Sequence, residues 1–171
     1  WTILGDNTFM ATFDGNGKKI SNLKVTDGSQ QSIGLFAKLG DGAVIKDLKI
    51  VNAVITLTYP DGDTTYKGKT SIGVLAGQVV GTKVKVSNVT ISDPTINVTN
   101  NSAIDHEMEI GGVFGLDHYT TSADAASYAR KSITVSGLNA WTTSDSGSLS
   151  PRQRKSRVSS VNAPRCGIAY G

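Results

Sequence analysis

Apolar and polar residues alternate over short stretches of this chain, which is the period of a β-strand with one buried face. The clearest stretch is residues 47–58, and its pattern recurs without a gap at residues 88–99. The apolar positions of the first copy return in the second, where Leu48, Ile50, Ile55 and Leu57 become Val89, Ile91, Ile96 and Val98. This is an internal repeat, so the fold has to explain it first.

Two other short patterns extend the repeat. Residues 22–27 copy the first half of the 47–58 block, and a glycine-led pattern recurs at Gly34, Gly73 and Gly112, each 39 residues after the last. Each unit exposes an apolar face that it cannot bury alone, and parallel stacking of like strands buries it. The sequence predicts an all-β right-handed parallel β-helix, or β-solenoid, truncated at both ends. The hand follows from the preference for right-handed crossovers.

A polar residue precedes the inward-facing pair in each copy of the block. These residues are Asn22, Asp47 and Asn88. We predict that the three side chains stack as a polar ladder at one structural corner of the coil.

The spacing between the repeats divides the chain. Residues 1–146 are predicted to form one β-helix domain with loop insertions near 59–70, 100–109 and 117–131. In the third insertion, the alanine-rich segment 122–131 predicts a short helix. Residues 147–171 are predicted to form a basic loop or tail, or the start of a further rung.

Composition and charge narrow the class of protein. Charged residues make up 18%, and the net charge of +3 is local, because five basic and no acidic residues follow Gly147. No aromatic residue interleaves these charges, so no nucleic-acid partner is expected.

No apolar run reaches the length of a membrane helix, so no membrane insertion is expected. The lone Cys166 cannot form an intrachain disulfide, and the start at Trp1 suggests an excised piece of a longer parent chain.

Several of these patterns together resemble a known family. They are Phe-Asp-Gly-Asn-Gly at 13–17 with Ile-Ser-Asn-Leu at 20–23, Gly-Leu-Phe at 34–36, and Ile-Lys-Asp-Leu at 45–48. They resemble the GLUG-motif β-helix repeats of bacterial surface and secreted proteins, closely over 1–116 and loosely over 117–146. The resemblance implies an extracellular, adhesin-like module or a companion of surface metallopeptidases, and it supplies no catalytic residues.

Two acidic clusters are candidate metal sites. Asp14-Gly15-Asn16-Gly17 begins like a calcium loop, but Lys18 and Lys19 occupy the next positions, so a structural turn is favoured. In the segment 105–109, strand alternation places Met108 on the inner face with His106, and Glu109 on an exposed acidic stripe. No metal or other cofactor is predicted.

A polysaccharide lyase is the enzymatic alternative, since it would place carboxylates and a basic residue on one wall. Lys24 and Lys49 could stack on one outer face, but Thr90 follows them in the next unit and no carboxylate shares their alternation. Three Asn-X-Ser/Thr sequons, at Asn88, Asn97 and Asn100, are expected by chance in such a sequence.

The first insertion carries two aromatic residues, Tyr59 and Tyr66, which we predict to be exposed and to bind a sugar ring or a protein surface. The predicted function is a non-catalytic module on a bacterial surface, or secreted, for adhesion, ligand display or spacing. Its partner would be a host glycan or a surface protein. The alternatives are a polysaccharide-active enzyme and an auxiliary domain of a surface metallopeptidase.

Overall fold

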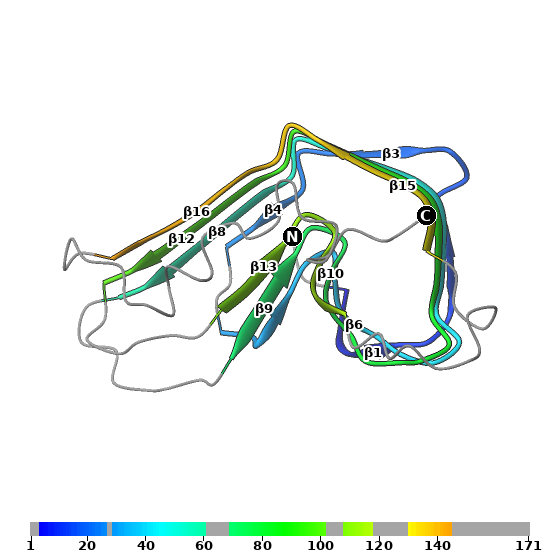
Figure 1. Cartoon of the computed structure of the whole chain (residues 1–171), viewed down its shortest axis with the longest axis horizontal. Helices are drawn as coiled ribbons and strands as arrows, with labels where there is room; N and C mark the ends of the chain where they lie inside the picture. Colours follow the sequence, from blue (N-terminus) through cyan, green and yellow to red (C-terminus); the bar gives the residue numbers. More distant parts are fainter. Residues whose placement is uncertain (1–3, 27–28, 61–68, 102–107, 118–129, 145–171) are drawn as a thin grey trace.

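The computed structural model describes residues 4–26, 29–60, 69–101, 108–117 and 130–144. All regular structure in these residues is β, and the strands form four parallel sheets (Figure 1). Among the described residues, no helix has the length and hydrophobicity to span a membrane. The prediction of an all-β fold with parallel stacking is confirmed.

The four sheets are named walls 1 to 4, in the order in which strands β5 to β8 visit them; the described part of the first rung has no strand in wall 1. Wall 1 contains β5 (Ser32–Ile33), β9 (Thr70–Gly73) and β13 (Met108–Gly111). Wall 2 contains β1 (Leu4–Phe9), β6 (Phe36–Leu39), β10 (Ala76–Val79) and β14 (Phe114–Asp117). Wall 3 contains β2 (Thr12–Asp14), β3 (Lys19–Ser21), β7 (Val44–Val51), β11 (Lys85–Ser92) and β15 (Arg130–Ser136). Wall 4 contains β4 (Lys24–Val25), β8 (Val54–Tyr59), β12 (Thr95–Asn100) and β16 (Asn139–Ser144).

One passage through the walls is a rung, and each rung lies in register on the one before it. The strands β1–β4 form the first rung, β5–β8 the second, β9–β12 the third and β13–β16 the fourth. In the second and third rungs, Leu48 lies opposite Val89, and Ile55 lies opposite Ile96. The predicted repeat of 47–58 at 88–99 is therefore confirmed strand by strand, and the arrangement is compatible with a β-solenoid.

The core consists of inward-facing apolar side chains that stack from rung to rung. Ile50 and Ile91 are fully buried in wall 3, and Ile55 and Ile96 are fully buried in wall 4. Parallel stacking places like residues above one another, so each rung buries the apolar face of its neighbour.

Aromatic rings fill the first-rung end of this core. The ring centroids of Phe9 and Phe36 are 4.8 Å apart, and those of Phe13 and Phe36 are 5.5 Å apart with an edge-on orientation. Such tilted and edge-on arrangements are the favoured ones for aromatic pairs.

The chain reverses sharply between walls 1 and 2, at a corner formed by Gly34, Gly73 and Gly111, named here the glycine corner (Figure 1). A Cβ atom on Gly73 would lie 2.5 Å from the backbone N of Gly115 and 2.6 Å from the Cα of Phe114. The predicted match of Gly73 with Gly112 is wrong by one residue, because Gly73 lies opposite Gly111. Two successive glycines, 111 and 112, made the pattern ambiguous.

The loop predictions are partly revised. The strand β15 begins at Arg130, so the predicted helix at 122–131 is wrong at its end, and residues 122–129 lie outside the described residues. The strand β8 continues through Tyr59 and β12 through Asn100, so both strands take in the first residue of a predicted insertion. The predicted basic tail, 147–171, lies outside the described residues.

Candidate binding surface

Two polar corners bound the second half of wall 3, one within its strands and one at their ends, and the corner residues have left-handed backbone conformations. The first corner contains Asp47, Asn88 and Ser132, with φ of 54°, 52° and 53°. The second contains Asn22, Asn52, Asp93 and Gly137, with φ of 57°, 53°, 52° and 64°. Asn and Asp adopt this conformation more readily than other side-chain-bearing residues, because their short polar side chains bond locally. The polar residues of the repeat therefore turn the backbone.

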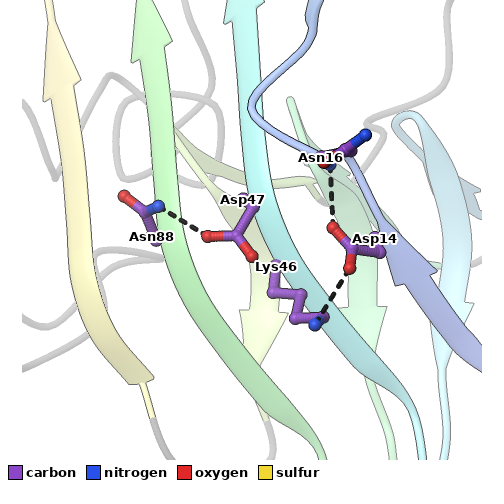
Figure 2. A network of polar contacts seen from close by, with 5 residues as sticks. All are labelled: Asp14, Asn16, Lys46, Asp47 and Asn88. Carbon is purple, nitrogen blue, oxygen red and sulfur yellow. Dashed lines mark hydrogen bonds and ion pairs between the residues drawn. The ribbon is translucent and has the colours of Figure 1, made fainter.

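The structure brings together two of the three predicted corner residues. The Nδ2 of Asn88 donates to the Oδ1 of Asp47 at 2.6 Å, between successive rungs (Figure 2). Asn22 is not part of this stack, because Ser21 lies opposite Val51 and the backbone N of Asn22 donates to the Val51 carbonyl at 2.9 Å. The prediction that Asn22 stacks with Asp47 is therefore wrong.

The displacement of Asn22 has a simple cause. The pair Leu23 and Val25 has the same alternation as Leu48 and Ile50, but Val25 lies opposite Ile55 in wall 4. Since alternation is identical in walls 3 and 4, it does not say which wall a short strand joins. The true counterpart of Asn22 is Asn52, five residues after the predicted one.

Asp14 anchors a turn on the outside of wall 3. Its Oδ1 accepts the backbone N–H of Asn16 at 2.8 Å, and its Oδ2 lies 2.9 Å from the Nζ of Lys46 (Figure 2). The hydrogen bond with Lys46 is the main cause of a lowered pKa at Asp14, and it raises the pKa of Lys46. Asn16 and Gly17 have φ of 49° and 68°, as the predicted structural turn requires.

The candidate metal site at Asp14 gains no further acidic or His ligands in the part of the chain that the structure describes. Among the described residues, no group of three or more His, Cys, Asp or Glu residues is placed to hold a metal ion. Residues 105–107 of the second candidate lie outside the described part of the chain.

Of the two predicted binding tyrosines, the structure describes only Tyr59, and Tyr59 is buried. Tyr59 is 2% exposed, and its hydroxyl lies 3.3 Å from the hydroxyl of Thr70. The prediction of an exposed, ligand-binding Tyr59 is wrong, because the inward alternation of Ile55 and Leu57 continues to Tyr59 at the end of β8. Tyr66 lies outside the described residues and stays a prediction.

Glu109 belongs to a polar cluster between walls 1 and 2. It forms an ion pair with Lys69, and its Oε2 accepts the hydroxyl of Ser71 at 3.3 Å, while the Nε2 of Gln78 donates to the same hydroxyl at 3.2 Å. Met108 is buried, as alternation predicted, but Glu109 is half-buried and does not contribute to an exposed stripe. The Ser71 hydroxyl, which is bonded to both Gln78 and Glu109, therefore joins the two walls.

The lysines on the outside of wall 3 are paired differently from the prediction. Lys49 lies opposite Lys19, whereas Lys24 lies opposite Val54 in wall 4. The predicted stack of Lys24 on Lys49 is therefore wrong, for the same reason that displaces Asn22. Alignment by corner residues, with Asn22 matched to Asn52, would have found Lys19.

Comparison with known proteins gives one partial likeness. No family model matches the chain, and no solved structure matches it. The chain is similar to Halomucin from Haloquadratum walsbyi, with 32% identity over 110 residues. The matched region is 64% of this chain but only 1% of Halomucin. The resemblance to GLUG-motif repeats and the expected bacterial origin both stay predictions, and the organism of this relative is an archaeon.

Proposed function

We propose that this chain is a non-catalytic module of an extracellular or cell-surface protein, built as a right-handed parallel β-helix and serving adhesion, ligand display or spacing. One observation carries the proposal: seven residue pairs join β7 to β11 in continuous register, and six join β8 to β12. Such stacking produces a regular pile of rungs whose outer faces can vary without disturbing the core.

The likeness to Halomucin supports the extracellular part of the proposal. Halomucin is a surface protein. Because this chain spans 1% of the length of Halomucin, the likeness bears on the module and not on the activity of the whole protein.

Three of the described carboxylates have structural partners, which favours a non-catalytic role over a polysaccharide lyase. Asp14 pairs with Lys46, Asp41 accepts the backbone N–H of Lys83 at 2.8 Å, and Glu109 pairs with Lys69. A lyase needs carboxylates grouped near a basic residue and free to meet a uronate. These carboxylates instead hold turns and neighbouring rungs together.

Two measurements test the proposal in cells of the source organism and on the purified chain. A brief protease treatment of intact cells should remove the epitope of an antibody against this module, or the epitope should be found in the medium. An epitope that stays intact until the cells are broken would contradict the extracellular assignment. Uronate polymers incubated with the chain should gain no ultraviolet absorbance from unsaturated products, and a steady gain would favour the lyase.

A further inference from the structure

Four lysines gather on one part of the outer surface, where wall 3 lies between its two polar corners and meets wall 4. Lys19 and Lys49 occupy directly opposed register positions in β3 and β7, and the backbone N of Lys49 donates to the carbonyl of Lys18 at 3.1 Å. Lys24 begins β4 just beyond the second corner. The four side chains are all exposed, and together they are named the lysine facet: Lys18, Lys19, Lys24 and Lys49. Figure 1 shows β3 running along the top edge of the coil, where this facet lies.

The protein supplies no counter-ion to the lysine facet within the described residues. Strands in a sheet lie about 4.8 Å apart, so Lys19 and Lys49 are like charges on neighbouring strands, which is unfavourable. The two carboxylates that neighbour this part of wall 3 in sequence already have partners, since Asp14 pairs with Lys46 and Asp47 accepts Asn88 (Figure 2). Asp47 and Asp93 lie at the two corners that bound the lysine facet, but neither forms an ion pair with its four lysines. The lysine facet is therefore a positive patch of four unpaired lysines.

Hydroxyl groups continue the same surface along the coil. The column that begins with Lys19 and Lys49 continues with Thr90 and Thr134. The neighbouring column carries the hydroxyls of Ser21, Ser92 and Ser136, with Val51 between the first two. These columns offer hydrogen-bond donors and acceptors at the regular spacing of the strands, next to the ammonium groups.

We propose that the lysine facet binds an acidic polysaccharide, a hydroxyl-rich polymer with repeated carboxylate or sulfate groups. The ammonium groups would meet the acidic groups, and the threonine and serine hydroxyls would meet the sugar hydroxyls. A single-stranded nucleic acid fits less well, because the described residues of this surface include no aromatic side chain on which a base could stack. The inference rests on the proposed adhesive function and names the class of ligand.

The test compares two double variants that remove the same charge. Lys19→Gln with Lys49→Gln removes the opposed pair, whereas Lys38→Gln with Lys85→Gln removes two lysines elsewhere on walls 2 and 3. Lys38 and Lys85 also lack an ion pair with any described residue, so they form a control that is matched in charge. Circular dichroism and the urea midpoint would establish that all three proteins fold alike.

Binding of the full chain is measured by biolayer interferometry on immobilised polygalacturonate, dextran sulfate, neutral dextran and single-stranded DNA. The K19Q/K49Q variant should bind its acidic polysaccharide roughly tenfold more weakly than the wild type, and the control variant within about twofold. Binding should weaken as salt is raised. Polygalacturonate carries carboxylate groups and dextran sulfate carries sulfate groups, so the two polymers distinguish these acids. Stronger binding to either one supports the inference.

Three results would overturn it. They are equal losses in the two variants, tighter binding to DNA than to either polysaccharide, and no binding of folded wild-type protein to either acidic polymer. The last would leave the surface-module proposal standing, since the protease treatment of intact cells tests that proposal without any ligand.

Discussion

The coil turns at two chemically different kinds of corner, and the difference explains two of its sequence patterns. At the glycine corner, Gly73 faces the backbone of the next rung, so that any side chain would overlap Phe114 and Gly115. At the polar corners, Asn52 and Asn88 have positive φ but point exposed side chains to solvent. The glycine corner needs a residue without a side chain, because the next rung leaves no room for a Cβ atom. The polar corners need a residue that tolerates a left-handed backbone conformation.

The largest effect is expected at the glycine corner. Gly73→Ala should lower the free energy of unfolding by about 3 kcal/mol or more, because backbone atoms cannot give way to the new Cβ as a side chain can. Urea unfolding followed by circular dichroism measures the change. Gly17→Asn is the matched control, because nothing lies within 4 Å of its Cβ position and asparagine tolerates its φ of 68°. A Gly73→Ala protein as stable as this control would show that space does not decide the glycine corner.

The polar corners should respond to a change of side chain in another way. Asn52→Ala should lower the free energy of unfolding by about 1 kcal/mol, since alanine adopts a left-handed backbone less readily. Asn52→Gly should stay close to the wild type, because glycine accepts this torsion and the asparagine side chain is exposed. The urea midpoints of the two variants measure these changes in stability. Equal losses of stability would mean that side-chain contacts, and not the backbone torsion, hold this corner.

A smaller effect should separate the two polar corners from each other. Asn88→Gly keeps the torsion but removes the bond to Asp47, so it should destabilise the protein by about 0.5 kcal/mol more than Asn52→Gly does. Asp47→Gly together with Asn88→Gly should then cost less than the sum of the single changes. Additive losses in this double-mutant cycle would show that the 2.6 Å contact contributes nothing to stability.

The smallest effect is expected on the acid side of the pH profile. The pKa of Asp14 is lowered in the folded state from its ordinary value of 3.8, so its contribution to stability is complete above pH 3.8. That contribution should be lost as the pH falls through the lowered, folded-state pKa. The wild type should therefore lose free energy of unfolding as the pH falls through this range, and Asp14→Asn should lose less of it. Urea unfolding at successive pH values measures the difference. Identical pH profiles for the variant and the wild type would contradict this.

Sequence reasoning found the walls and misplaced one strand. The register of β7 on β11 and of β8 on β12 follows from the alternation of apolar residues, because inward positions repeat in both copies. The first rung was harder, since β3 and β4 have only three and two residues and the pattern of one wall fits the other. The register of β3 on β7 and the positive φ of Asn22 and Asn52 align these corners, and neither is visible in hydrophobic periodicity.

The candidate binding residues were harder to predict than the fold. Tyr59 was expected outside because it opens the predicted insertion at 59–70, but the period of β8 determines its orientation. The opposition of Lys19 and Lys49 depends on how many residues the Asn16-Gly17 turn inserts between β2 and β3. Predicting which surface residues lie opposite each other requires the exact register of the two strands. Predicting which residues are buried requires only the alternation along one strand.

The buried contact between the hydroxyls of Tyr59 and Thr70 has an engineering consequence. It joins the end of β8 to the start of β9, so both ends of the intervening segment are held by the core. A flexible segment grafted between fixed anchor points adds only about 0.6 kcal/mol of entropic cost for each doubling of its length. The position between Pro60 and Lys69 is thus a natural place to exchange foreign peptides, and the coil could serve as a carrier for epitopes.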